Sequence, residues 1–225
     1  MTSNTVTSNT VTSNTVTSNI MTSNVPVRLI WGQAYDLQGL AGAMGVNGGM
    51  PWRLSPDLRY FKAMTISCPV IMGRGTWDSM PEKFRPLPGR ENIVVSRNPD
   101  FNPNGAKSFT NIQDAICYAK KWIEDNPIEL VDSSDLPKDG RAIWIIGGGA
   151  IFREVINSKI VDAAYVTQID TRVEADTFAP NIQKLVDDGL WTIARDGDWQ
   201  ESPIKVGANQ FDAKYKFMVY KPVKR

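Results

Sequence analysis

The stretch AIWIIGGGAIFREVI, residues 142–156, decides the fold of this chain. Its apolar start predicts a buried strand, its three glycines predict a tight turn, and the spacing of its later apolar residues predicts a helix. The stretch CPVIMGRGTWDSM, residues 68–80, follows the same plan, with a strand at 70–72, a turn at 73–75 and a helix capped by Thr76. Repeated strand–turn–helix units indicate a parallel sheet covered by helices.

The segments outside these two units extend the pattern. NIQDAICYAKKWIED (111–125) predicts a helix whose apolar face holds Ile112, Ala115, Ile116, Ala119, Trp122 and Ile123. Further strands are predicted at VRLIWGQA (27–34), ENIVVSR (91–97), AAYVTQIDT (163–171), WTIARDG (191–197) and AKYKFMVYKPV (213–223). The last two alternate apolar and polar residues, as antiparallel strands exposed on one side do. The sequence thus predicts an α/β domain whose sheet is mainly parallel at its centre and closes on a C-terminal antiparallel hairpin.

The first 24 residues differ from the rest of the chain. They repeat TSNTV with a period of five and contain no charged residue. Because the period is odd, successive valines would point to opposite faces of a strand and cannot form one apolar face. We expect residues 1–24 to be a disordered tail and residues 25–225 to be a single domain. The polar residues 126–140 are expected to form a surface excursion.

Composition excludes several classes of function. The 25 basic and 24 acidic residues nearly balance, which argues against a nucleic-acid or membrane partner. The chain has no histidine, so Ser-His-Asp and Cys-His catalysis is excluded. Its two cysteines, Cys68 and Cys117, have neither metal-ligand nor disulfide spacing. We therefore expect a cytoplasmic protein without a metal site, in which a carboxylate, lysine, tyrosine, thiol or water moves any proton.

Asp57 is the candidate carboxylate, in MPWRLSPDLRYFK (50–62). Ser55 and Pro56 predict a helix start, with Ser55 as N-cap and Pro56 at the first helical position. Asp57 would then share a helix face with Phe61, and this face continues through Leu54, Leu58 and Met64. The helix dipole alone would favour an acid in the first turn, so a purely structural role stays open at this point.

Two strand–turn–helix junctions could hold phosphate. The glycines at 147–149 let a ligand approach the backbone, and the helix after them offers free N–H groups. Arg74 stands beside the other helix start, and Ser96 with Arg97 ends a third strand. Together they are typical of a site for a phosphorylated dinucleotide, although three glycines alone are more often a tight connection between packed elements. Neither junction has the spacing of a Walker loop or of GxGxxG.

Two loops have both a functional and a plain interpretation. Five glycines between residues 39 and 49 indicate either a mobile flap that closes over a site or a simple surface loop. In RPLPGR (85–90), two prolines stiffen the chain. Arg90 could therefore form a bidentate pair with a substrate carboxylate, or it could form a surface salt bridge.

Seven motifs, in order, resemble the dihydrofolate reductase family, and its bacterial, especially actinobacterial, members most. They are LIWGQA, MPWRLSPDLRYFK, VIMGRGTWDSM, RPLPGRENIVVSR, WIIGGGAIF, VTQID and EADTFAP. The resemblance implies a mixed eight-stranded sheet flanked by helices, in a monomer. It also implies NADPH-dependent reduction of 7,8-dihydrofolate to tetrahydrofolate, for one-carbon metabolism and thymidylate synthesis, with antifolates as inhibitors.

The resemblance implies roles for single residues on the substrate side. Asp57 would hydrogen-bond the pterin 2-amino group and N3, Thr167 would hydrogen-bond Asp57, and Trp52 would hold an ordered water. Arg90 would bind the α-carboxylate of the glutamate tail. The other substrate-binding residues that it implies are Ile30, Phe61, Met80, Leu87 and Ile146.

On the cofactor side, Gly32 would lie by the nicotinamide carboxamide, the phosphates would meet Arg74, Thr76, Ser96 and Arg97, and the pyrophosphate would pass along residues 147–151. The peptide bond between Gly147 and Gly148 would be cis. The implied cofactor residues are Gly32, Met50, Arg74, Gly75, Thr76, Ser96, Arg97, Gly147, Gly148, Gly149, Ala150, Ile151 and Phe152. Two of them depart from the family pattern, because many bacterial members have Tyr at Phe152 and some relatives have a basic residue at Ala150.

The implied reaction moves a hydride to pterin C6 and a proton to N5. Asp57 would lie across the ring from N5, so a water is the better proton donor. Burial by Phe61 and Leu54 should raise the pKa of Asp57.

Two alternatives to this function stay open. They are a related NADPH enzyme of the same fold, such as a pyrimidine reductase of riboflavin synthesis, and a non-catalytic NADPH- or folate-binding module.

Overall fold

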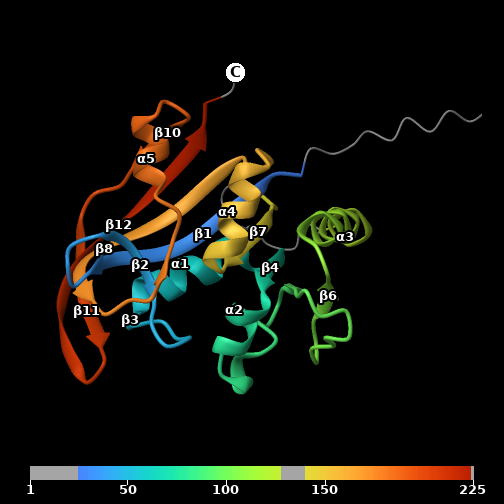
Figure 1. The fold of residues 1–225 in the computed structure, drawn as a ribbon, viewed down its shortest axis with the longest axis horizontal. Coiled ribbons are helices and arrows are strands. Elements are labelled where there is room, and N and C mark those ends of the chain that lie inside the picture. The colour runs from blue at the N-terminus through green and yellow to red at the C-terminus, as the bar shows by residue number, and fades with distance from the viewer. Residues whose placement is uncertain (1–24, 128–139, 224–225) are drawn as a thin grey trace, which may run out of the picture.

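The computed structural model describes residues 25–127 and 140–223. The N-terminal TSNTV repeat and most of the predicted excursion at 126–140 lie outside the described residues. The described residues form a single sheet with helices on both of its faces (Figure 1).

The sheet contains twelve strands within the described ranges. They are β1 (Val27–Asp36), β2 (Ala41–Gly45), β3 (Trp52–Leu54), β4 (Pro69–Gly73), β5 (Glu91–Val95), β6 (Lys107–Phe109), β7 (Ile143–Gly147), β8 (Ala163–Val173), β9 (Thr177–Phe178), β10 (Trp191–Asp196), β11 (Gln200–Val206) and β12 (Asn209–Pro222). The main path runs β3-β11-β12-β8-β1-β7-β4-β5-β6, while β2 pairs with β1 and β9, and β10 pairs with β12.

The centre of the sheet is parallel and one side is antiparallel. Parallel pairing joins β8, β1, β7, β4, β5 and β6, and antiparallel pairing joins β12 to β8, β10 and β11. The predicted mixed sheet with a parallel centre and a C-terminal antiparallel hairpin is therefore confirmed. The resemblance implied eight strands, and the higher count arises because short strands such as β2, β3 and β9 pair at the margins.

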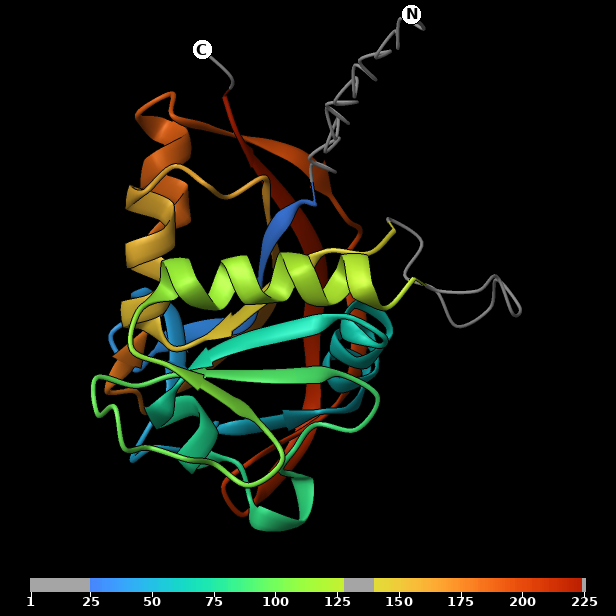
Figure 2. The same cartoon turned by 90° about the vertical axis from the view of Figure 1, so that its right-hand side faces the viewer.

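Helices cover both faces of this sheet. They are α1 (Ser55–Thr65), α2 (Arg74–Ser79), the 3-10 helix η1 (Glu82–Phe84), α3 (Ile112–Asp125), α4 (Gly149–Asn157) and α5 (Ile182–Asp187). Buried residues of α3, α4 and α5 pack into one core cluster, and those of α1 and α2 pack into another on the opposite face. Figure 2 shows the yellow-green helix α3 running alongside the teal and green strands β4 and β5. The predicted stripe of α3 is buried at Ile112, Ala115, Ile116 and Ala119, and its last members, Trp122 and Ile123, are half-buried.

The predicted starts of two helices are wrong. Ser55 is the first residue of α1 and not its N-cap, which puts Pro56 one position later than expected, and Leu54 is the N-cap. Thr76 lies inside α2, whose N-cap is Gly73, so the expected turn at 73–75 is absent. In both places a strand runs directly into a helix. The last strand residue, in extended conformation, then takes the capping position, and no side chain caps either helix.

One member of the predicted apolar face of α1 is also misplaced. Leu58 is 42% exposed, whereas Leu54 and Met64 are buried. Leu58 follows Asp57 directly, so it lies about 100° around the helix from it and turns away from the core. The buried face of α1 is therefore narrower than the sequence predicts, and Asp57 belongs to it.

Candidate functional site

Asp57 lies where β1, β3 and α1 meet, and it is only 7% exposed. A Cβ placed on Gly32 of β1 would lie 3.1 Å from Asp57 Oδ2 and 3.5 Å from Cζ2 of Trp52. A side chain at this position would crowd the carboxylate, so glycine suits the close approach of the strand. The structure thus brings three of the predicted site residues, Gly32, Trp52 and Asp57, into one group.

Burial determines the charge state of Asp57. It raises the pKa of this carboxyl to about 6, and a hydrogen bond from the Thr167 hydroxyl opposes the rise by stabilising the carboxylate. Thr167 can reach Asp57 because β8 pairs with β1 in a register that places Thr167 opposite Gly32. An acid in the first turn can interact favourably with the helix dipole while it stays exposed, and burial of a carboxylate costs free energy. The burial of Asp57 is therefore more than the helix dipole requires.

Trp52 adds an unsatisfied donor beside this carboxylate. Its side chain is buried, and its Nε1 has no hydrogen-bond partner among the described residues. Buried polar groups are nearly always hydrogen-bonded, to protein or to an ordered water. A water or a ligand atom next to Trp52 would therefore complete the site.

The apolar residues predicted for the substrate side gather on the same face of the sheet. Ile30 is buried in the core cluster that contains Met64 and Trp77. The other four residues, which are half-buried, pack against this cluster, namely Phe61, Met80, Leu87 and Ile146. Half-buried apolar side chains beside a buried polar group can cover a flat, mostly apolar ligand.

Arg90 stands at the edge of this apolar group. Its Nη1 donates to Thr65 Oγ1 at 3.2 Å and its Nε to the Pro88 carbonyl at 3.0 Å, and its Cζ lies 5.8 Å from the Phe61 ring centroid. Burial lowers the pKa of the Arg90 guanidinium. Because an arginine pKa lies far above neutral, the side chain still stays cationic. Within the described ranges no carboxylate pairs with it. The alternative of a surface salt bridge is therefore not what the structure shows.

The predicted cofactor residues lie on, or directly after, four neighbouring strands. Gly32 is on β1, the glycines 147–149 end β7 and begin α4, Thr76 is in α2 after β4, and Ser96 follows β5. A Cβ on Gly147 or Gly148 would lie 3.1 or 3.3 Å from Thr76 Oγ1, so these two junctions touch. The Gly147–Gly148 peptide bond is cis. These residues form a row across β1, β7, β4 and β5. The row spans three strand spacings, about 14 Å, which suits an extended dinucleotide.

The far end of this row is positively charged. Arg74 Nε donates to Asp78 Oδ2 at 3.2 Å, and Arg97 is exposed. Ser96 is buried, and its Oγ accepts a hydrogen bond from the Asn98 backbone N–H. The Ser96 O–H remains able to donate to an anion. Because β4 and β5 are parallel with Gly73 opposite Val95, the residues that follow them, Arg74 and Ser96, leave the sheet side by side.

The remaining predicted cofactor residues have mixed environments. Gly149 is buried, and a Cβ on it would lie 2.6 Å from the Phe178 carbonyl oxygen. Phe152 is also buried, and its ring centroid lies 5.1 Å from that of Trp31. Ile151 is half-buried, whereas Gly75 and Ala150 are exposed. Met50, just before β3, is 56% exposed.

The glycine-rich stretch contains a short strand and a bridge, which neither sequence interpretation includes. Residues 41–45 form β2, which pairs with β1 and β9, and a β-bridge joins Val46 to Gly49. Asp176 holds this segment, since its backbone N–H donates to the Gly45 carbonyl at 3.0 Å and its Oδ2 accepts from the Asn47 N–H at 2.7 Å. The second bond lowers the pKa of Asp176. Asp176 lies in the EADTFAP motif, but no local pattern indicates this role, because its partner Asn47 is far away in the chain.

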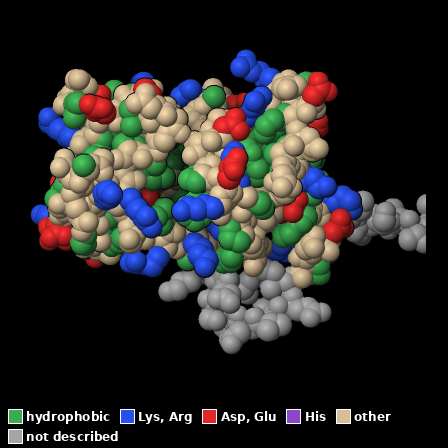
Figure 3. Space-filling view, turned by 90° about the horizontal axis from the view of Figure 1, so that it is seen from below, with side chains coloured by type: hydrophobic (Ala, Val, Ile, Leu, Met, Phe, Trp, Pro, Cys, Tyr) green, Lys and Arg blue, Asp and Glu red, His purple; other side chains and the backbone are tan. Residues whose placement is uncertain are grey.

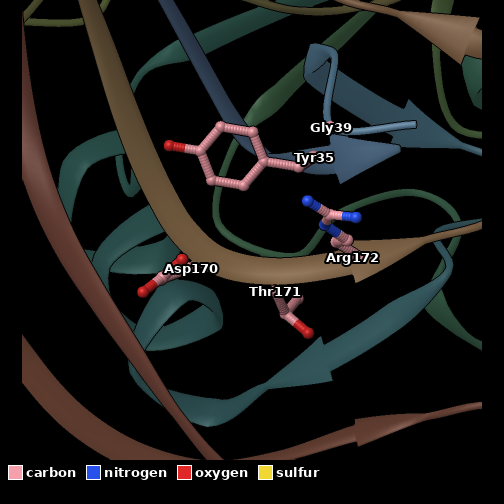
Figure 4. Close-up of a pocket in the computed structure, with 5 residues that line it drawn as sticks. All are labelled: Tyr35, Gly39, Asp170, Thr171 and Arg172. Carbon is pink, nitrogen blue, oxygen red and sulfur yellow. The ribbon is translucent and has the colours of Figure 1, made fainter. Parts of the chain in front are cut away.

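Two surface cavities lie away from these residues. One of about 380 Å³ is lined by Tyr35, Gly39, Asp170, Thr171 and Arg172, and the Tyr35 ring and Arg172 lie on the same side of β8 (Figure 4). The other, of about 540 Å³, lies between the starts of β1 and β8 and the end of β12. Neither cavity is lined by a predicted site residue.

The surface seen in Figure 3 is hollowed, and Lys and Arg side chains lie along the hollow.

The residues that the structure describes contain neither a metal-binding cluster nor a membrane-spanning helix. No group of three or more Cys, Asp or Glu side chains there could hold a metal ion. No helix in residues 25–127 or 140–223 is long and apolar enough to span a membrane.

Comparison with known proteins gives a consistent result. The family model described as dihydrofolate reductase matches residues 28–217. Dihydrofolate reductase of Mycobacterium leprae is 37% identical over 176 residues, which cover 77% of this chain and 88% of that protein. Dihydrofolate reductase of Heliothis virescens is 38% identical, over 63% of this chain and 74% of that protein. The bifunctional dihydrofolate reductase-thymidylate synthase 2 of Arabidopsis thaliana is 34% identical, over 62% of this chain but only 24% of its own length.

Proposed function

Because this chain belongs to the dihydrofolate reductase family and is an oxidoreductase, we propose that it reduces 7,8-dihydrofolate to 5,6,7,8-tetrahydrofolate with NADPH. The observation that supports this most is the buried Asp57, which accepts a hydrogen bond from Thr167 and touches the backbone of β1 at Gly32. A buried carboxylate beside apolar side chains suits a flat heterocycle that carries N–H donors.

The described residues also fit the proposed cofactor. The backbone at Gly147 and Gly148 lies so close to Thr76 that a side chain there would crowd its hydroxyl, and the row of strand ends matches an extended dinucleotide. Gly32 would face the nicotinamide end, residues 147–151 with Thr76 the pyrophosphate, and Arg74, Ser96 and Arg97 the 2′-phosphate. When bound, NADPH supplies the hydride that the pterin C6 receives.

Asp57 orients the substrate in this proposal. Its carboxylate accepts hydrogen bonds from the pterin 2-amino group and N3, and Thr167 holds the carboxylate in place. The negative charge also favours positive charge on the ring, and so favours protonation of N5. Its effect is strong because the carboxylate is desolvated.

The proton for N5 comes from a water rather than from Asp57. A carboxylate that binds N3 and the 2-amino group lies on the opposite side of the pterin ring from N5. Trp52 has a buried Nε1 that needs an acceptor, so it can bind and orient a water in the site. Phe61, Met80 and Leu87 would cover the benzoyl portion, and Arg90 would bind the tail carboxylate.

The test is NADPH oxidation by the purified protein with and without dihydrofolate. We expect oxidation that depends on dihydrofolate and that an antifolate abolishes. Oxidation that depends instead on a pyrimidine substrate would favour the related reductase. Binding of NADPH or folate without turnover would favour the non-catalytic module. The expected monomeric state and cytoplasmic location stay predictions.

A further inference from the structure

Phe101 packs against the guanidinium of Arg74. The ring centroid lies 4.9 Å from Arg74 Cζ, while Asp78 accepts a hydrogen bond from Arg74 Nε at 3.2 Å. The guanidinium is thus held on one face by the ring and along one edge by the carboxylate. Its two terminal amino groups, Nη1 and Nη2, make no hydrogen bond within the described residues, and half of the side chain is exposed.

The loop that carries Phe101 is fixed at both ends. At its start, Ser96 Oγ accepts from the Asn98 N–H at 3.2 Å, and the Asn98 carbonyl accepts from the Phe101 N–H at 3.2 Å. At its end, Gly105 lies against Pro86, where a Cβ would come within 2.9 Å of the proline ring. Phe101 itself is half-buried against the core cluster of α1 and α2. The ring is therefore a fixed platform.

We propose that Phe101 is a positioning residue that gives the cofactor site its preference for a 2′-phosphate, because it holds Arg74 ready beside Ser96. This inference rests on the proposed NADPH function. An arginine that is free in solution loses side-chain freedom when it binds a phosphate, and prior ordering removes part of that cost. The aromatic face attracts the cation without occupying any of its N–H donors.

Asp78 alone does not account for this arrangement. An exposed pair between residues four apart on a helix is weak, and its carboxylate competes with a phosphate for the same guanidinium. The Phe101 ring, unlike Asp78, fixes the orientation of the guanidinium without adding a negative charge. Arg74 and Ser96 directly follow adjacent parallel strands, so the terminal N–H groups of Arg74 and the Ser96 hydroxyl can bind the same phosphate.

The test measures dissociation constants for NADPH and for NADH, which lacks the 2′-phosphate, in five proteins. They are the parent chain, Phe101→Leu, Phe101→Tyr, Arg74→Gln and the distant control Phe211→Leu. We expect Phe101→Leu to weaken NADPH binding about two- to fivefold and to leave NADH binding unchanged. Phe101→Tyr keeps the ring and should behave like the parent, as should Phe211→Leu. Arg74→Gln should weaken NADPH binding at least about tenfold.

The outcomes separate this inference from the proposed function. If the parent does not prefer NADPH over NADH, the cofactor assignment fails and the inference fails with it. If Arg74→Gln loses the preference while Phe101→Leu keeps it, the inference alone is overturned. Equal weakening of both nucleotides in Phe101→Leu would mean that the ring only packs, which also overturns it. Phe101→Met, which has no ring, repeats the measurement if Phe101→Leu does not fold.

Discussion

At the scale of single residues, the chemistry depends on the charge of Asp57. Its pKa is about 6, so the carboxylate is mainly ionised at neutral pH even though it is buried. We expect Asp57→Asn to lower kcat/KM about a hundredfold or more at neutral pH, because the variant keeps the shape but loses the charge that favours protonation of N5. In mild acid the loss should shrink, since the substrate then arrives protonated. Steady-state kinetics across this pH range measure the effect.

A matched control for this variant is Asp212→Asn, which removes an exposed carboxylate on β12. It should leave kcat/KM unchanged at every pH. Turnover of Asp57→Asn equal to that of the parent at neutral pH would remove Asp57 from the reaction.

The same carboxylate should reduce the stability of the folded protein. Its pKa in the folded state is about 6, above the ordinary value of 3.8, so between these pH values the folded state binds more protons than the unfolded state. The free energy of unfolding therefore falls as pH rises through this window, by roughly 3 kcal/mol in all. We expect Asp57→Asn to be more stable than the parent at neutral pH, by up to that amount, and urea unfolding at several pH values measures it. A stability difference that does not change with pH would contradict the raised pKa.

Much of the residue scale was predictable from local sequence, but not the contacts. The hydrogen bond between Thr167 and Asp57 is predictable only through the family resemblance. The two residues are far apart in the chain, and the register of β1 with β8 brings them together. Phe101 was not predicted, since no local pattern shows that its loop returns to Arg74. Candidate functional side chains can therefore be chosen from a sequence, but the contacts between distant residues cannot.

At the scale of elements, two interactions hold the glycine-rich segment in place. One is the pairing of β2 with β9, and the other is the hydrogen bond from the Asn47 N–H to Asp176, just before β9. Asp176→Ala removes the acceptor for the Asn47 N–H and leaves the backbone pairing of β2 with β9. We propose that this segment closes over the site, and we therefore expect faster amide exchange at residues 46–49 and slower turnover. Hydrogen exchange together with single-turnover kinetics measures both. Acid should loosen the segment in the parent as well, because protonation of Asp176 removes the interaction that lowers its pKa.

The control for this variant is Asp170→Ala, which removes another exposed carboxylate, on β8. It should leave exchange at residues 46–49 as in the parent. Unchanged exchange in Asp176→Ala would show that the strand pairing alone holds the segment.

Element types were predictable because apolar periodicity distinguishes strands from helices. The starts of α1 and α2 were not, because capping preferences assume a loop before the helix, and here β3 and β4 lead straight into one. The exposure of Leu58 has a related origin. Its place on the helix was predictable, but the width of the buried face depends on what packs against it.

At the scale of the whole molecule, strand order places the site. β1, β7, β4 and β5 are neighbours in the sheet although they are not consecutive in the chain, and this order aligns the glycines and Arg74 in one row. The parallel centre of the sheet was predictable from the repeated strand–turn–helix units. The order of the strands was not, because it depends on crossover connections that no local pattern encodes.

The N-terminal repeat gives a prediction at this scale. If residues 1–24 do not pack on the domain, a chain without residues 2–24 should have the same kcat, KM and thermal midpoint as the full chain. A chain in which these residues are shuffled is the matched control for length and composition. A large loss of turnover in the shortened chain, but not in the shuffled one, would show that the tail contributes through its length.

The most direct test of the proposed function is a crystal structure of the protein with NADPH and a folate bound together. We predict that the pterin 2-amino group lies within hydrogen-bond distance of the Asp57 carboxylate, with the nicotinamide beside Gly32 and the 2′-phosphate between Arg74 and Ser96. A complex in which the pterin binds elsewhere, with Asp57 still packed against Gly32 and touching no ligand, would contradict it.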